Sequence, residues 1–279
     1  MTTLSSVIGE RNLRDATTRA NLQAAARFIE EVLTAAGHGV THQRFLTEGT
    51  LTENLQVEIP GMVAPHELVV VGAHYDTAHF SPGADDNASG CAALLMLARA
   101  LVGAALMRTL RLVFFVNEEP PLTRTPRMGS AVYAAACRRR RDRVRAMISL
   151  ESLGFHQHSR RSLDYPLPLR LFNPLPTDDV AIVGNPASAP LVWRIHRTLS
   201  QRCGVASTRM VLPGFVPGVR SSDHWSFWQQ GYPAVMITDT ALLRYRHYHR
   251  ATDTEEKLDY QQLARITSAL EAVVLDLTR

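Results

Sequence analysis

Apolar and polar positions along the chain follow two spacings that alternate from one stretch to the next. Apolar residues three and four apart predict helices, and short continuous apolar runs predict strands buried on both faces. The expected helices cover about residues 19–36, 87–101, 129–140, 187–203, 223–230 and 258–277. The expected strands cover about residues 39–45, 53–59, 67–75, 110–117, 145–151, 179–183 and 233–239, and the first two resemble edge strands.

This order of elements favours one fold class. Strands that alternate with helices are typical of α/β proteins in which helices cover a largely parallel sheet. We therefore expect a three-layer α/β sandwich with a central mixed, mostly parallel sheet flanked by helices. No repeat or linker interrupts the pattern, so residues 1–279 are expected to form a single domain. The proline-rich stretch 155–179 is interpreted as a loop beside the substrate, with a plain surface excursion as the alternative.

Ionisable side chains gather where the expected strands end. His74 and Asp76 lie at the end of strand 67–75, Glu118 and Glu119 follow strand 110–117, and Glu151 closes strand 145–151. The carboxyl ends of parallel strands meet at one edge of a sheet, where ligands of open α/β sheets bind. A lone histidine at a strand end is more often an ordinary polar residue, but several such side chains at one edge indicate a site.

Two further segments fit the same edge of the sheet. The first is the turn-rich loop "SPGADDNASG", residues 81–90, which contains Asp85 and Asp86. Taken alone, these aspartates are explained by the favourable effect of acidic side chains at a helix start. The second is "HYHRATDT", residues 247–254, whose three histidines and one aspartate show no apolar period. That composition suits a site loop better than a core element.

This combination of residues is typical of a site for two metal ions. Zinc binds histidine nitrogen and carboxylate oxygen, and two zinc ions about 3.5–4 Å apart can share a bridging carboxylate and a water molecule. Adjacent carboxylates such as Glu118 and Glu119 repel unless cations lie beside them. Because neighbours in an extended chain point to opposite sides, one glutamate can bind metal while the other acts as a general base.

Sequence signatures of competing chemistries are missing. The chain has no G-x-S-x-G motif, so a serine hydrolase lacks its nucleophile. It has no G-x-G-x-x-G or Walker A motif for a nucleotide and no H-E-x-x-H helix of a zincin. A metal-dependent hydrolase is therefore the chemistry that the residues favour.

Composition and charge add only broad limits. The apolar content of 46% and the charged content of 20% are those of a soluble globular protein. The formal net charge is +4, and much of this excess lies in residues 137–146 and 158–162, which we interpret as solvated helix ends and not as a nucleic-acid surface. The three distant cysteines indicate reduced thiols. Because we see no signal peptide, and Arg99 interrupts the apolar stretch 91–107, we expect a cytoplasmic protein without a membrane span.

Five motifs together resemble one enzyme family. They are "GAHYDT", "GADDNASG", "NEEPP…MGS", "SSDHWSFWQQGYPAVMITDT" and "YHRATDTEEKLDY", and they cover about residues 55–275. In this order and spacing they resemble the zinc aminopeptidases of metallopeptidase family twenty-eight, which include the secreted bacterial leucyl aminopeptidases. Glutamate carboxypeptidase and the glutaminyl cyclases share the fold of this family. The N-terminal helix and "IGERN" also resemble a bacterial subgroup.

The resemblance implies a role for each matching position. It makes residues 1–279 a metallopeptidase catalytic domain, with Glu118 as the general base. The implied zinc ligands are His74, Asp86, Glu119, Glu151 and His249, with Asp86 as the bridge. Asp76 would orient His74, and Asp223 and His224 would line or support the pocket. The peptide bond after Asp86 is often cis in such proteins.

Two positions depart from the family pattern. Glu151 stands where many relatives have aspartate, which leaves the spacing and occupancy of its metal open. Some relatives carry a tyrosine shortly before "SDH" that is thought to stabilise the oxyanion, whereas this chain has "PGVRSSDH". His224, Tyr245 and Tyr248 are the candidates for that task.

The expected function is therefore hydrolysis of the N-terminal residue of peptides by a metal-activated water, with two Zn²⁺ as cofactors. One zinc ion or another divalent metal is the alternative for the cofactor. The alternative function is a single-zinc glutaminyl-peptide cyclotransferase, and a non-catalytic receptor or scaffold is disfavoured because the ligands are kept. The expected partner is a peptide with a free N-terminus, without nucleic acid or membrane.

Overall fold

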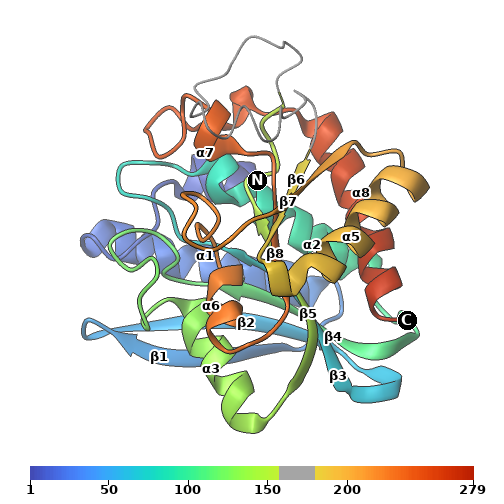
Figure 1. The fold of residues 1–279 in the computed structure, drawn as a ribbon. Helices are drawn as coiled ribbons and strands as arrows, with labels where there is room; N and C mark the ends of the chain where they lie inside the picture. Colours follow the sequence, from blue (N-terminus) through green and yellow to red (C-terminus); the bar gives the residue numbers. More distant parts are fainter. Residues whose placement is uncertain (157–179) are drawn as a thin grey trace.

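The computed structural model describes residues 1–156 and 180–279. Its centre is one sheet with the strand order β1-β2-β4-β3-β5-β8-β6-β7. The strands are β1 (Val40–Thr47), β2 (Thr50–Ile59), β3 (Gly61–His74), β4 (Leu106–Phe115), β5 (Arg143–Glu151), β6 (Val180–Gly184), β7 (Ser207–Val211) and β8 (Ala234–Thr238). Figure 1 shows this sheet crossing the molecule with helices packed around it.

The sheet is mixed, as the sequence predicts. The pairs β3/β4, β3/β5, β5/β8 and β6/β7 are parallel, and the pairs β1/β2, β2/β4 and β6/β8 are antiparallel. The three strands at the centre of the site, β4, β3 and β5, run parallel to one another. Their carboxyl ends therefore meet at one edge, which we call the carboxyl edge.

Helices cover both faces of the sheet. The main helices are α1 (Ala16–Ala35), α2 (Gly90–Ala100), α3 (Gly129–Arg140), α5 (Ala189–Arg197), α6 (His224–Gln229), α7 (Ala241–Arg244) and α8 (Tyr260–Leu277). Alternation along β3 separates the two layers, because successive side chains of a strand point to opposite faces. Val69 and Val71 belong to one buried cluster with residues of α1, α2, α5 and α8, whereas Leu68 and Val70 belong to a second cluster with residues of α3 and α6. The expected α/β fold with a helix-flanked mixed sheet is confirmed.

The N-terminal helix shows how local sequence sets an element. Asp15 caps α1, because its side chain accepts a hydrogen bond from the Thr18 amide at 2.9 Å and its own amide donates to the Thr18 hydroxyl at 3.0 Å. The helix therefore begins three residues earlier than the apolar period indicates. Ile29 and Leu33 on its apolar face are fully buried, and the helix ends before Gly37, whose φ of 95° suits glycine.

Several expectations about the elements differ from the structure. β2 lies between β1 and β4, so it is not an edge strand. The expected helix 187–203 is divided into a short turn, α5 and a final π-helical turn, and the strand β7 was not expected. Residues 157–179 of the expected loop 155–179 lie outside the described residues. Within the part of the chain that the structure describes, no helix is both long and apolar enough to cross a membrane.

Candidate metal centre and active site

Three neighbouring strands deliver the residues predicted at strand ends to the carboxyl edge. His74 is the last residue of β3, and Glu151 is the last residue of β5. Glu118 and Glu119 follow β4, which pairs with β3 on its other side. All four side chains are more than nine-tenths buried. Buried carboxylates at one edge need compensating positive charge, so the arrangement calls for cations.

Two segments far apart in the sequence add Asp86 and His249 to this group of side chains. Asp86 lies in the π-helical turn η2 (Ala84–Ser89), and its peptide bond to Asn87 is cis. His249 lies in the loop that follows α7. Asp253 of the same loop accepts hydrogen bonds from the amides of Asp85 at 2.9 Å and Asp86 at 3.2 Å. The role of Asp253 in holding the Asp86 turn was not predicted, although the residue belongs to the singled-out "HYHRATDT" segment.

Asp86 lies between the two histidines. Its Oδ1 is 3.2 Å from His74 Nε2, and its Oδ2 is 3.0 Å from His249 Nε2. His74 Nε2 is also 3.3 Å from Glu151, and His249 Nε2 is 3.2 Å from Glu119. The five side chains thus form two half-sites, His74 with Glu151 and His249 with Glu119, which share Asp86.

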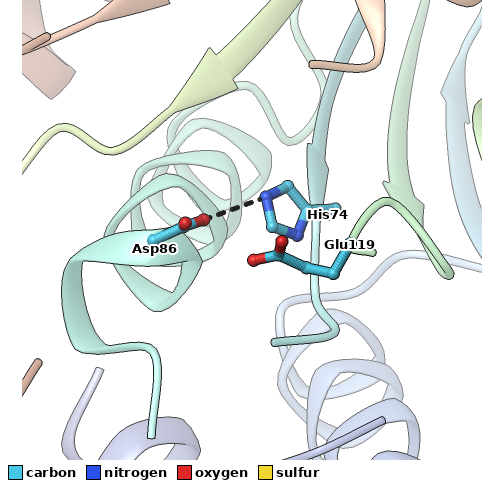
Figure 2. A group of neighbouring side chains, drawn as sticks. All are labelled: His74, Asp86 and Glu119. Carbon is cyan, nitrogen blue, oxygen red and sulfur yellow. Dashed lines mark ion pairs between the residues drawn. The ribbon is translucent and has the colours of Figure 1, made fainter. Parts of the chain in front are cut away.

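These separations fit the spacing of metal ligands. Ligand atoms at about 2.0–2.1 Å from a tetrahedral zinc ion lie about 3.3 Å apart. One ligand atom from each of His74, Asp86 and Glu119 lies within 4.8 Å of the other two, and Figure 2 shows the three side chains turned toward a common point. The Nε2 atoms of both histidines and both Asp86 oxygens are buried and lack a hydrogen-bond partner. The residues present therefore fit zinc.

Electrostatics give the same result. Burial raises the pKa of Glu119 to about 7, and the charge of Asp86 adds to this effect. Burial opposes the charging of His249, but its contacts with Asp86 and Glu119 raise its pKa to about 10. The pKa of His74 is also raised, because the effects of Glu151, Asp76 and Asp86 outweigh burial. The carboxylates thus demand positive charge, and divalent cations meet this demand.

Asp76 contacts both the histidine and the glutamates. Its Oδ1 is 3.5 Å from His74 Nδ1, which is consistent with the expected orienting contact. Its two oxygens also accept hydrogen bonds from the amides of Glu118 and Glu119, each at 3.1 Å. This second contact was not predicted. Through it, one buried carboxylate fixes the direction of the chain that carries both glutamates.

The adjacent glutamates have different surroundings. Glu119 contacts His249 and so belongs to a half-site. Glu118 accepts a hydrogen bond from the Thr123 hydroxyl at 3.4 Å and forms no ion pair with either histidine of the half-sites. Burial raises the pKa of Glu118 well above its ordinary value. The two neighbouring side chains are therefore placed for different tasks.

The last three residues of the "SSDH" segment are buried beside the half-sites. Ser222 donates a hydrogen bond to Glu151 Oε2 at 2.7 Å. This serine thus contacts the glutamate that stands where many relatives have aspartate. Asp223 is fully buried, and burial raises its pKa to about 7. His224 donates from Nε2 to the Val219 carbonyl at 2.8 Å and packs edge-on against Trp228. Burial lowers the pKa of His224 to about 4, so it is a neutral core histidine.

An apolar pocket opens beside the metal ligands. The Tyr248 ring stacks on His249 with 4.0 Å between ring centroids, and both Tyr248 and Glu151 line the pocket. The other walls are mostly apolar side chains and include Val183, Met210, Leu212, Val216, Val219, Met236, Leu242 and Leu243. By contrast, the hydroxyl of Tyr245 donates to Asp253 at 3.0 Å. Of the three candidates for oxyanion stabilisation, Tyr248 is therefore the residue at the pocket.

Comparisons with known proteins agree with this geometry. The chain is 37% identical over 259 residues to the uncharacterized protein YfbL of Escherichia coli, which covers 90% of this chain and 79% of YfbL. The curated aminopeptidases that it matches are longer, and the chain spans about half of their length.

Solved structures show the same fold. The zinc aminopeptidase BSAP from Bacillus subtilis superposes with a TM-score of 0.78 at 16% identity, over 99% of this chain and 92% of BSAP. The glutaminyl cyclase of Fimbriiglobus ruber superposes with a TM-score of 0.71 at 19% identity, over 98% and 91% of the two chains. The model of Peptidase family M28 matches residues 54–274. The chain therefore belongs to Peptidase family M28, which confirms the family resemblance and the expected enzyme class, a metallo-exopeptidase.

Proposed function

We propose that the protein is an aminopeptidase that binds two zinc ions and removes the N-terminal residue of peptides. One observation carries the proposal: the two oxygens of Asp86 face different histidines, at 3.2 and 3.0 Å, and each histidine also contacts a glutamate. A carboxylate shared in this way is what a bridging ligand requires. Membership of the M28 family and the zinc aminopeptidase fold support it.

In this proposal the five ligands divide by contact. His74 and Glu151 hold one ion, His249 and Glu119 hold the other, and Asp86 binds both. When bound, zinc acts as a Lewis acid that lowers the pKa of water and polarises a carbonyl group. The histidines must be neutral at Nε2 to bind, so metal binding displaces protons from them.

Glu118 and Tyr248 would handle the proton and the carbonyl oxygen. Glu118 is not part of a half-site, so its carboxylate is available to accept the proton of the attacking water and pass it to the leaving amine. The Tyr248 hydroxyl, carried by a ring stacked on His249, would donate to the oxygen of the scissile carbonyl as charge develops there. The Asp76 carboxylate, which accepts a hydrogen bond from the Glu118 amide, would keep Glu118 in place.

The pocket lined by Glu151 and Tyr248 would receive the side chain of the N-terminal residue. Its walls are apolar and include Val183, Met210 and Met236. An apolar wall stabilises leucine or methionine by removing apolar surface from water, and it leaves a charged side chain desolvated. We therefore infer a preference for peptides with an apolar N-terminal residue.

A second candidate is a single-zinc glutaminyl cyclase. The likeness to the Fimbriiglobus ruber cyclase favours it, because the same fold carries that activity. The complete pair of half-sites favours the peptidase, since a one-zinc enzyme does not need both. Metal content and substrate choice separate the two.

The test uses the purified protein at neutral pH with zinc. Bound zinc is measured per chain. The rates of hydrolysis of leucyl, glutamyl and lysyl anilides are compared with the rate of cyclisation of peptides that begin with glutamine. The proposal expects two zinc equivalents, turnover of the leucyl anilide above the charged ones, and loss of activity with a chelator. One equivalent together with cyclisation, and no anilide release, would instead identify a cyclase.

A further inference from the structure

Arg11 is a fully buried arginine outside the half-sites. Its exposed fraction is 0%, and among the described residues its guanidinium donates to backbone carbonyls alone. Nε donates to Tyr75 at 2.6 Å, Nη2 donates to Gly83 at 3.1 Å, and Nη1 contacts Leu4 and Gly9 at 3.1 Å and Pro82 at 2.7 Å. The Leu4 and Gly83 carbonyls also accept from the amides of Gly9 and Ala88, each at 3.1 Å. One side chain thus hydrogen-bonds to three segments: the N-terminal segment, the exit of β3 and the residues before η2.

Two of these three segments supply the site. Tyr75 lies between His74 and Asp76, directly after β3. Pro82 and Gly83 form the turn that leads into η2 and Asp86. Arg11 therefore joins the segment that carries His74 to the segment that carries Asp86, although Arg11 is far from both segments in the sequence.

The joined segments leave little room for adjustment. Gly83 has a φ of 58°, and a Cβ there would lie 2.4 Å from the Asp86 carbonyl oxygen and 2.5 Å from Thr77 Cγ2. The Arg11 amide donates to the Thr77 hydroxyl at 3.0 Å, and the Thr77 amide donates to the Arg11 carbonyl at 2.9 Å. The turn thus packs directly between Asp86 and the exit of β3, and Arg11 closes it.

The charge of Arg11 is compensated at a distance. The guanidinium has no carboxylate among its hydrogen-bond partners, and a buried charge is unfavourable without compensation. Burial lowers the pKa of Arg11, whereas the carboxylates of Asp76, Asp253 and Asp86 oppose this effect. The acidic centre that these hydrogen bonds organise therefore offsets part of the cost of burying the guanidinium.

We propose that Arg11 is a positioning residue that sets the place of the shared ligand Asp86 relative to His74. The proposal rests on the two-zinc function proposed above. A lysine has the charge but not the planar fork of five donors, so it cannot hold Tyr75, Pro82 and Gly83 together. The loss should appear as weaker metal binding and a looser Asp86 turn, not as altered substrate binding.

The experiment compares Arg11→Lys with Leu4→Ala, a matched control in the same N-terminal segment. Leu4 is fully buried, so its truncation destabilises the segment, but the Leu4 carbonyl and Arg11 remain. For each protein, zinc affinity is measured by competition with a chelator, and kcat and KM are measured at saturating zinc. Amide hydrogen exchange of residues 75–89 is measured in the metal-free protein.

Arg11→Lys should raise the zinc dissociation constant by about 10–100-fold, the range found for groups that support metal ligands. Exchange in residues 75–89 should become faster, KM should stay the same, and added zinc should restore much of kcat. Leu4→Ala should lower the melting temperature without these changes. Equal effects of both variants on metal affinity and exchange would make Arg11 merely structural and overturn the proposal.

The test also works if Arg11→Lys does not fold or if the wild-type protein binds no zinc. If Arg11→Lys does not fold, Thr77→Val is used, because it removes only the hydroxyl that accepts from the Arg11 amide. It should also weaken zinc binding and speed exchange in residues 75–89, and wild-type behaviour would overturn the proposal. If the wild-type protein binds no zinc, the proposed function fails, whereas the exchange comparison still decides the positioning role.

Discussion

At the scale of single residues, the site depends on side chains that lie next to each other in sequence and differ in contact. Glu118 and Glu119 follow the same strand, and Asp76 binds the amides of both. Only Glu119 contacts His249. The backbone of Asn117, just before them, has a φ of 63°, a left-handed conformation that is uncommon outside glycine and often found at functional sites.

The first prediction separates the two glutamates. Glu118→Gln should keep both zinc ions and substrate affinity but lose about 10²–10⁴-fold in kcat, the usual contribution of a general acid–base group. Glu119→Gln should lose metal affinity, and added zinc should restore part of its activity. Zinc content and kcat of the two purified variants check this. Loss of metal in Glu118→Gln, with metal kept in Glu119→Gln, would reverse the roles.

The second prediction concerns the shared aspartate. Asp86→Ala should weaken the binding of both zinc ions, because both half-sites lose a ligand. His74→Ala or His249→Ala should mainly weaken the binding of one zinc ion, since each histidine belongs to one half-site. Equilibrium dialysis at increasing zinc concentration gives the stoichiometry of each variant. If Asp86→Ala keeps two tightly bound ions, Asp86 is only an acidic residue at a helix start.

At the scale of elements, the end of the sheet opposite the site is held by a cluster of charges. Glu67 at the start of the buried part of β3 accepts a hydrogen bond from Arg108 of β4 at 2.8 Å and another from Arg145 of β5. The hydrogen bonds to Arg145 and Arg108 lower the pKa of Glu67 to about 2. One carboxylate thus joins the three strands whose other ends carry the metal ligands.

The third prediction follows from the lowered pKa of Glu67. A carboxylate with a folded pKa near 2 and an ordinary value of 4.5 stabilises the fold fully above pH 4.5, and this contribution is lost as the pH falls toward 2. Glu67→Gln should therefore unfold at lower urea concentration than wild type at pH 6, and the difference should vanish near pH 2. Metal-free protein is used, so that ligand protonation does not intervene.

A matched control for Glu67 is Glu58→Gln. Within the described part of the chain, Glu58 forms an ion pair with Arg111 alone, at 2.7 Å, and its side chain is 42% exposed. Exposed pairs contribute little to stability, so this variant should change the urea midpoint less. A difference between Glu67→Gln and wild type that stays constant from pH 6 to pH 2 would contradict the role given to Glu67.

At the scale of the whole molecule, the proposed metal centre connects distant parts of the chain. Its five ligands come from β3, η2, the exit of β4, β5 and the loop after α7. A metal that binds only the folded state stabilises it, by about 2.7 kcal/mol when the free metal is at 100 times its dissociation constant. We therefore expect the proposed centre to stabilise the folded protein as well as to supply its chemistry.

The fourth prediction is a loss of stability on metal removal. A chelator should lower the melting temperature at pH 7, and the loss should shrink at lower pH, because protonation of the histidine ligands already weakens metal binding there. Scanning calorimetry with and without chelator from pH 5 to pH 8 checks this. A melting temperature that does not respond to the chelator at pH 7 would contradict a structural contribution of the metal.

The local sequence was sufficient to place several of the helices and strands. The helix α3 covers residues 129–140, as expected, and β3, β4 and β5 end close to the expected residues because continuous apolar runs are long and their polar ends abrupt. Since parallel strands align their carboxyl ends, the same pattern placed His74, Glu118, Glu119 and Glu151 at one edge. The fold class was within reach of the sequence for this reason, and the family was within reach because five motifs resemble it.

Other features depended on contacts between distant segments. The strand β7 has a polar sequence, "STRMV", and exists because it pairs with β6, and β2 is interior because it pairs with β4. Ser222 contacts Glu151, and Asp253 holds the Asp86 turn, only after the chain has folded. Nothing in the local sequence marks Arg11 as buried, since burial of a guanidinium is favourable only where tertiary structure gathers enough carbonyls around it.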